Sequence, residues 1–443
     1  MKTLISMIFL LSLCTACGSG GSSAETPGPA GTDPGATAMN PPPVNPPPAD
    51  MQPPPPRPPD PTPPVVKPST APTDWPAFSQ VLAGTARDLP PAFLPVKDLP
   101  AFKIYAERIE KMWKPVEQKK NIIEKWVKTE LADQNNACKT LFYPFSGPDF
   151  LHVHLLFPGC RDIVMIGLEP AGTLPELSKI LEKPEKFFSK MEESLTHILT
   201  LSFFRTKSMK DDFFGREVPE IDGTLAPILF MMARTGQKVT GLERVQLNWD
   251  GQVEAWTGAP LPEPPAPPAK PGKKPRKAAK PKIWKPVSGL KYTYLAPGET
   301  APRTLIYFSC NLANETYREV DGILFRPDVQ KYLKKLEIST TYTKAASYLM
   351  HEENFNWIRG FVLEHSPSLL QDDSGIPISF FDGKKWTLAL YGHYDVPIKL
   401  FLKYTQADLA RRYTDRKRVR ALPFGIGYKV YPGRSNLQLA IRK

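Results

Sequence analysis

The chain has 443 residues, a formal net charge of +12 and 52 prolines. Eight of its positive residues lie within residues 270–285, which contain no acidic residue, so the rest of the chain is nearly neutral. Because the charge is so unevenly distributed, the overall basic charge does not indicate a nucleic-acid-binding protein.

The first residues have the layout of a secretory signal peptide. Lys2 precedes an almost unbroken apolar run over residues 4–13, which as a helix would be about 15 Å long, half the hydrocarbon core of a bilayer. Small residues follow this run, as they do in a cleaved signal. We therefore expect residues 1–16 to be a signal peptide, and no later stretch to be apolar enough for a membrane-spanning helix.

The end of this signal resembles the lipobox of bacterial lipoproteins, in which cleavage occurs before a cysteine that is then acylated. Cys17 follows Ala16 and Thr15, which fit the motif, whereas Cys14 stands where leucine is usual. Cys14 itself fits less well, because the large Leu13 precedes it directly. The resemblance implies lipidation with palmitate at Cys17 and, since no aspartate follows, attachment to the outer membrane. The alternative is ordinary signal cleavage and a soluble secreted protein.

Residues 17–74 are expected to be the lipid anchor and a disordered spacer. Residues 24–74 contain 20 of the 52 prolines, in runs that cannot bury a core. Proline favours extended polyproline II, which at about 3.1 Å per residue would hold the body up to about 150 Å from its anchor.

Residues 75–443 are expected to form a globular body with a proline- and lysine-rich insertion at about 257–287. Within 102–131 the apolar residues recur at helical spacing, and Pro115 predicts a break into two helices. The expected buried face consists of Ile104, Ile109, Trp113, Ile122, Ile123, Trp126 and Leu131.

Alternation and apolar runs predict the remaining elements. Strands are expected at 140–147, 162–170, 243–249, 290–295 and 304–309. Helices are expected within 176–234 and at 327–336, 343–351 and 354–365, and a terminal hairpin at 428–430 and 437–441 around the turn at 432–433. These elements predict an α+β or mixed α/β fold, a mixed sheet with flanking helices and a C-terminal β-hairpin. The likeness of 140–150 to 304–314 leaves open two related halves.

Three cysteines lie in the body, and their spacing matches no zinc site. Cys138 and Cys160 stand at the starts of two predicted strands, where a disulfide would contribute about 3 kcal/mol. Intervening strand geometry could instead hold them apart, and the three cysteines, with Cys310, cannot all pair.

Candidate chemistry lies in three turns. Asp372 and Asp373 are adjacent carboxylates, which can raise a pKa and make a proton donor or hold a hard cation, although the same residues also suit a tight turn. Asp149 precedes His152 and His154, which would share one face of a strand and could bind a metal, but no third ligand stands at a telling distance.

His393 is the remaining candidate, beside Asp395 in a turn that contains glycine. The chain has no GxSxG, Walker, GxGxxG or SxxK motif. We therefore expect neither a metal nor a cofactor, and leave open whether the protein is an enzyme.

The basic part of the insertion could act as an electrostatic arm for anionic lipid headgroups or envelope polymer. Its residues are Lys270, Lys273, Lys274, Arg276, Lys277, Lys280, Lys282 and Lys285. Trp284 is its one aromatic residue, so stacking on nucleic-acid bases is not supported. The alternative is a solvated loop.

Four segments of the body resemble a family of bacterial proteins with no assigned function. They are YPFSGPDF at 143–150, LEPAGTLP at 168–175, KAASYLMH at 344–351 and QDDSGIP at 371–377. The resemblance supplies no residue roles, and implies only that these turns act together.

These observations favour an exported, lipid-anchored envelope protein with a non-catalytic binding or structural role. The alternative is an envelope hydrolase that uses Asp372 or Asp373 as acid or base, with His393 or Asp149 as partner. The two hypotheses differ in whether these four side chains share one site.

Overall fold

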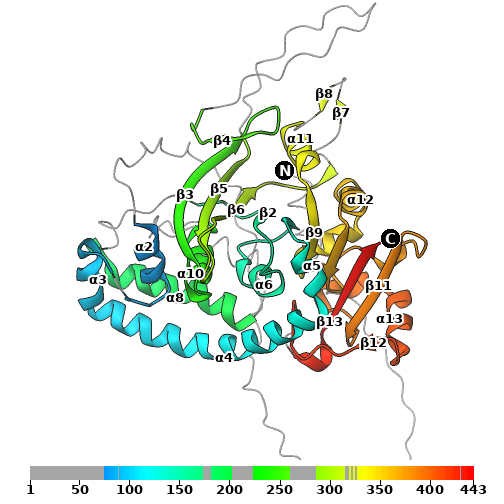
Figure 1. Cartoon of the computed structure of the whole chain (residues 1–443), viewed down its shortest axis with the longest axis horizontal. Helices are drawn as coiled ribbons and strands as arrows, with labels where there is room; N and C mark the ends of the chain where they lie inside the picture. Colours follow the sequence, from blue (N-terminus) through cyan, green and yellow to red (C-terminus); the bar gives the residue numbers. More distant parts are fainter. Residues whose placement is uncertain are drawn as a thin grey trace, which may run out of the picture. The chain divides into compact units, whose positions relative to one another are not determined.

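The computed structural model describes residues 74–87, 89–172, 181–201, 223–259, 286–314, 319–320, 323–324, 327–429 and 431–443 (Figure 1). The expected signal peptide, Cys17, the spacer up to residue 73 and the eight basic residues of the insertion lie outside the described residues. The described residues all belong to one compact unit.

The described part of the chain is built on one mixed sheet of eleven strands, as the sequence analysis predicts, with a separate two-stranded ribbon of β7 and β8. The strands are β1 (Thr140–Pro144), β2 (Asp162–Gly167), β3 (Lys238–Leu247), β4 (Val253–Ala255), β5 (Ser288–Leu295), β6 (Arg303–Ser309), β7 (Glu319–Val320), β8 (Ile323–Leu324), β9 (Ile338–Thr343), β10 (Ser368–Gln371), β11 (Trp386–Gly392), β12 (Val419–Arg420) and β13 (Asn436–Arg442). Their order in the large sheet is β12-β11-β13-β10-β9-β1-β2-β6-β5-β3-β4.

The centre of this sheet consists of five parallel strands in the order β10-β9-β1-β2-β6. From β1 the chain adds β2 and β6 on one side, and then returns to add β9 and β10 on the other. The strand order therefore reverses between β1 and β9, as it does in doubly wound α/β folds. The parallel centre and its reversal were not predicted from the sequence, because antiparallel strands on both flanks interrupt the alternation of strands and helices.

Strands β1 and β2 are buried over all but their first residue, which is typical of strands covered on both faces. In β1 and β2 the register pairs Thr140 with Asp162. Continued by two residues, the same register places Cys138 opposite Cys160, and the structure joins these two residues in a disulfide with a Cα–Cα distance of 4.7 Å. The disulfide, which the sequence alone did not decide, therefore links the amino-terminal ends of two neighbouring strands.

Helices cover the sheet and follow its crossovers (Figure 1). The α-helices are α2 (Trp75–Leu82), α3 (Leu94–Asp98), α4 (Pro100–Glu130), α5 (Ala132–Asn136), α6 (Phe150–Leu156), α8 (Pro184–Leu201), α10 (Leu225–Arg234), α11 (Pro327–Lys335), α12 (Asn356–His365) and α13 (Ala407–Thr414). Short 3₁₀ turns occupy Pro91–Phe93, Ala346–His351, Glu353–Phe355, Ile378–Phe380, Lys399–Tyr404 and Pro432–Arg434.

The expected break at Pro115 is wrong, because α4 runs through it as one helix of 31 residues (Figure 1). Pro115 removes one backbone hydrogen bond at an exposed position, while Trp113 and Ile123 on either side are buried against the core. Packing of both halves offsets the cost of the proline. Of the expected buried face, Ile104 and Ile122 point to solvent instead.

The C-terminal hairpin is also corrected. The last strand, β13, lies inside the sheet, antiparallel to both β10 and β11, and does not pair with the segment before the turn at 432–433. Leu437 and Leu439 on one face and Gln438 and Ala440 on the other are all buried, as expected for an inner strand that is covered on both faces. Alternation predicts the strand correctly but not its partners.

The segments 140–150 and 304–314, whose likeness suggested two halves, contribute β1 and β6 to the same sheet, with β2 between them. Their continuations differ, because β1 leads into α6, whereas β6 is followed by the ribbon of β7 and β8. Of the helices expected within 176–234, α8 and α10 are present, and residues 202–222 lie outside the described residues.

Candidate functional site

Three neighbouring strands end at one edge of the sheet, and a charged residue follows each of them. Since β1, β9 and β10 are parallel, their carboxyl ends meet at this edge. Asp149 comes after β1, Lys344 directly after β9 and Asp372 directly after β10. The strand order reverses here, and ligands of open α/β sheets bind at such a point. We call the residues gathered here the edge cluster: Asp149, His152, Lys344, Tyr348, Asp372, Asp373, Ser374, Lys429 and Asn436.

Two residues other than glycine have positive φ at this edge. Phe145 (φ +59°) follows the last residue of β1, and Ala345 (φ +58°) follows Lys344. This conformation costs about 1–2 kcal/mol, so the surrounding contacts must hold it. The Phe145 ring packs against Phe355, and the Ala345 backbone N–H donates to Asp372 Oδ2 at 3.1 Å.

The prediction of a helix over 343–351 is wrong because of the positive φ at Ala345. β9 continues to Thr343, and the positive φ at Ala345 prevents a helix from beginning there. Only a 3₁₀ turn, Ala346–His351, follows. This tight turn brings Lys344 back over the end of β1.

Asp149 is the first centre of the edge cluster. Its Oδ1 lies 2.8 Å from His152 Nδ1, and its Oδ2 lies 2.7 Å from Lys344 Nζ. The Tyr143 hydroxyl donates to the same Oδ2 at 3.1 Å. Asp149 also caps α6, since its side chain accepts from the His152 backbone N–H. All three charged or titratable groups are at most 5 % exposed.

His152 and His154 do not share a face, contrary to the sequence prediction. They lie on α6, where residues two apart point about 200° from each other, rather than on a strand. His152 faces Asp149, whereas the His154 ring stacks on Phe150 and its Nε2 lies 3.3 Å from the Gln237 amide. This geometry removes the basis for a metal site of these two histidines.

The charges of the first centre are set by burial and by one another. Burial lowers the pKa of His152 to about 4, although Asp149 acts against this, so the ring is neutral near pH 7. Burial alone would raise the pKa of Asp149, but His152 and the Lys344 ammonium outweigh it and hold that pKa well below its usual range. With a neutral ring, His152 donates Nδ1–H to Asp149, and Lys344 supplies the balancing positive charge.

We expect acid to weaken the fold between about pH 6.5 and pH 4. The unfolded chain binds a proton at His152 near pH 6.5, but the folded chain does so only near pH 4, so stability is lost as the pH falls through this interval. The loss for a group this well buried is about 3 kcal/mol. His154 and His351, whose pKa values burial also lowers to about 4, act in the same direction.

Asp372 acts in the opposite direction, because its folded pKa of about 6 lies above its usual value and acid therefore favours the fold there. Urea unfolding at pH 7 and pH 4.5 would measure the balance, and His152→Gln should shrink the difference between the two values. An equal difference in the two proteins would contradict this role of His152.

Asp372 is the second centre. Its Oδ1 accepts from the Ser374 backbone N–H at 2.9 Å and from the Ser374 hydroxyl, and its Oδ2 accepts from Ala345. Burial and the neighbouring Asp373 charge raise the pKa of Asp372 to about 6, against the effect of these hydrogen bonds. Gly427 abuts the same carboxylate, and a side chain there would collide with it.

Asp373 is the third centre, and it joins the edge cluster to the next strands. Its Oδ1 accepts from Asn436 at 2.9 Å, while Oδ2 accepts from the Tyr348 hydroxyl at 2.7 Å and lies 3.5 Å from Lys429 Nζ. Tyr348 in turn stacks on Phe401. Three of the four segments singled out in the sequence, 143–150, 344–351 and 371–377, thus meet through direct contacts.

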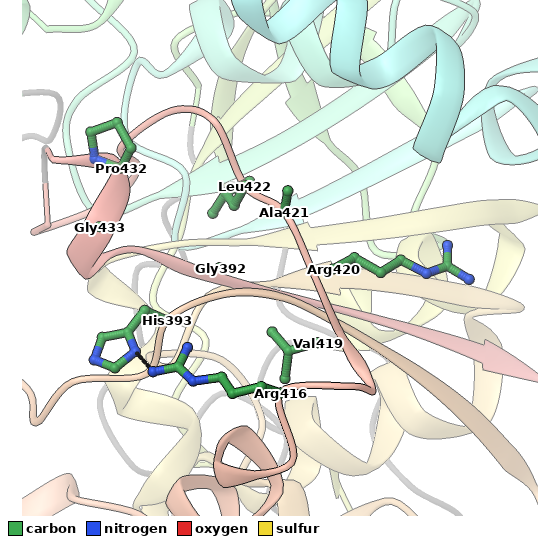
Figure 2. A pocket seen from close by; sticks show the side chains of 9 residues that line it. All are labelled: Gly392, His393, Arg416, Val419, Arg420, Ala421, Leu422, Pro432 and Gly433. Carbon is green, nitrogen blue, oxygen red and sulfur yellow. Dashed lines mark hydrogen bonds between the residues drawn. The ribbon is translucent and has the colours of Figure 1, made fainter.

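His393 lies apart from the three aspartates. It follows β11, and its Nδ1 lies 3.0 Å from Arg416 Nη2 in an open hollow beyond β13 (Figure 2). None of Asp149, Asp372 and Asp373 lines this hollow. Of the four residues proposed for catalysis, the structure therefore brings three into one cluster and leaves His393 outside it.

The cationic half of the edge cluster was not predicted from the sequence. Lys344 is 2 % exposed, which is rare for a lysine and requires a buried partner. The sequence did carry a sign that Lys344 matters. It directly follows a β-branched and aromatic run, which is typical of a buried strand, and it begins the segment 344–351 singled out in the sequence analysis. Lys429 and Asn436 carried no comparable signal, since only tertiary structure brings them to Asp373.

Across the described residues, no three His, Cys, Asp or Glu side chains are grouped so that they could hold a metal ion. Among the helices of the same ranges, none is both long and apolar enough to cross a bilayer.

Comparison with models of known families, with curated proteins and with solved structures finds no match for this chain. The geometry of the edge cluster is therefore the basis for a functional proposal.

Proposed function

We propose that the chain is an exported lipoprotein of the bacterial cell envelope whose body has a non-catalytic binding role. In this proposal palmitate on Cys17 attaches it to the outer membrane, the spacer up to residue 74 holds the body away from the anchor, and the carboxyl edge of the parallel strands frames the binding site. Its partners are the membrane, through the anchor, and an anionic envelope polymer or headgroup, which the basic arm of residues 270–285 also contacts in this proposal; they do not include nucleic acid.

One observation carries the binding role: both oxygens of each aspartate in the edge cluster already contact protein groups. Asp149 is held by His152 and Lys344, Asp372 by Ser374 and Ala345, and Asp373 by Asn436, Tyr348 and Lys429. A general acid or base must reach a proton of its substrate. These carboxylates are at most 5 % exposed, so they support the loops of a site rather than act on a substrate.

The disulfide supports the export part of the proposal. Stable disulfides form mainly in oxidising compartments such as the bacterial periplasm and the cell surface, and are rare in the cytosol. Cys138 and Cys160 are both buried, and the strand register itself places them opposite each other.

An envelope hydrolase remains the second candidate, and one observation favours it. The pKa of Asp372, raised to about 6 by burial and by Asp373, suits a proton donor near neutral pH. Its proposed partners do not assist, because His393 contacts Arg416 and Asp149 is held by Lys344.

Incubation of the purified chain with envelope fractions at low salt tests both candidates. We expect retention of the protein without release of soluble fragments, and weaker retention when the eight basic residues of 270–285 are replaced by glutamine. A variant with the same segment in shuffled order keeps the charge and is the matched control. Equal retention of all three proteins would contradict the proposal that the basic arm binds the envelope.

Release of soluble fragments that Asp372→Asn abolishes would instead establish the hydrolase. Mass spectrometry of the mature N-terminus from a bacterial host tests the anchor in the same preparation. An acylated Cys17 is expected, and an unacylated N-terminus in the aqueous fraction would overturn the anchor.

A further inference from the structure

The open hollow beside the edge cluster has a volume of about 670 Å³ and a cationic wall (Figure 2). Gly392 and His393 form one side, the residues around the end of β12 form another, and the turn at Pro432 and Gly433 closes it. Figure 2 shows the Arg416 side chain extended toward His393 across this hollow.

The segment that lines the hollow is strongly basic. Residues 411–420 contain six arginine or lysine residues and one acid, Asp415. Such a concentration of one charge next to a concave surface attracts anions.

The arginines of this segment differ in their partners. Arg418 pairs with Asp415 at 3.2 Å, and Arg420 pairs with Glu130 at 2.9 Å, so both charges are balanced. The Arg416 guanidinium instead donates to a ring nitrogen of His393. No carboxylate in the described ranges pairs with Arg416.

This contact positions Arg416 without neutralising it. A guanidinium has five N–H donors in a planar fork, and the bond to His393 uses one of them. The others can bind two oxygens of a phosphate group side by side. Gly433 has open space where a side chain would stand, so a ligand can approach the backbone there, whereas Gly392 packs against the Ser435 backbone oxygen and Leu422.

The hollow also adjoins the edge cluster. Gly392, which lines it, pairs in register with Asn436, and the Asn436 side chain holds Asp373. The hollow and the carboxyl edge of the parallel strands are therefore parts of one continuous edge of the sheet.

We propose that this hollow is a binding site for a phosphate group, in which Arg416, positioned by His393, binds the phosphate oxygens. The inference rests on the proposed binding function and names the chemistry of its ligand. The phosphate group could belong to a small soluble ester or to a lipid headgroup, and both present the same oxygens to Arg416.

Isothermal titration calorimetry tests the site. The full-length protein is titrated at physiological ionic strength with inorganic phosphate and, separately, with glycerol 3-phosphate. Vesicles of neutral lipid with and without phosphatidic acid test the membrane source. We expect saturable binding with one site per chain, weakened about tenfold or more by Arg416→Gln, as is typical when a charge-assisted hydrogen bond is removed.

Arg418→Gln is the matched control, because it removes the same charge only two residues from Arg416. The Arg418 side chain is exposed and paired with Asp415. This substitution should change the affinity by less than about twofold, since a surface ion pair contributes little. Both variants remove exposed side chains, so thermal unfolding should show the same stability for all three proteins.

Three results would overturn the inference: no saturable binding of any of these compounds, unchanged binding in Arg416→Gln, or equal weakening in both variants, which would indicate diffuse attraction. Binding of the soluble phosphates alone would assign the site to a small ester, and preference for phosphatidic acid vesicles would assign it to a headgroup. The proposed function is tested by retention on envelope fractions in the variants of residues 270–285, so failure of the hollow and failure of the proposed function remain distinguishable.

Discussion

Replacement of Lys344 by methionine is expected to lower the free energy of unfolding by about 3–5 kcal/mol, which is the usual cost of leaving a buried charge without its partner. Lys344 Nζ lies 2.7 Å from Asp149 Oδ2, and both side chains are at most 3 % exposed. The substitution keeps the length of the side chain, so the lost charge dominates the effect. Urea unfolding at pH 7 would measure it.

The double variant Asp149→Asn with Lys344→Met separates the lost charge from lost packing. Asparagine also caps helices well, so α6 keeps its first turn, and about half or more of the stability should return because no unpaired charge remains. Lys120→Met, which breaks a partly exposed pair with Glu124, is the control and should cost less than about 1 kcal/mol. Equal losses in the double variant and in Lys344→Met would contradict this account.

Loss of the disulfide is expected to lower the free energy of unfolding by about 3 kcal/mol when both Cys138 and Cys160 are replaced by serine. The bridge closes a loop with a sequence separation of 22, and the entropy of that loop in the unfolded chain sets the size of the effect. Chemical denaturation with and without a reducing agent would measure it.

Cys310→Ser is the control for the disulfide, because Cys310 takes no part in the bridge. A reducing agent should destabilise the natural chain and the Cys310→Ser protein alike, and should leave the doubly substituted protein unchanged. A natural chain that is insensitive to reduction would show that the bridge contributes nothing to stability.

The three aspartates of the edge cluster were visible in the sequence because local chemistry marks them. Asp372 and Asp373 adjoin Ser374 and Gly375, and Asp149 follows a strand that ends in proline and glycine. Strand ends of a parallel sheet carry functional residues, so polar residues directly after buried runs are natural candidates. The same reasoning selected His393, which also follows a strand, but β11 ends two strands beyond β10 and its side chain faces Arg416.

The partners of these aspartates could not be read from the chain. Lys344 and His152 are 192 residues apart, and only the reversal of strand order between β9 and β1 brings them within 3.1 Å. Asn436 reaches Asp373 because β13 inserts between β10 and β11 instead of forming a terminal hairpin. Strand pairing between distant segments depends on burial of both faces of the sheet, which local alternation does not specify.

Local pattern by itself determined the mixed class of the fold, about half of its strands and helices, and the two turns that carry Asp149 and Asp372, because periodicity and turn chemistry act between near neighbours. The tertiary structure decided that α4 continues through Pro115, that Cys138 meets Cys160, and that Lys344 neutralises Asp149. Each of these depends on packing between segments distant in sequence, where the free energy of burial outweighs local preference.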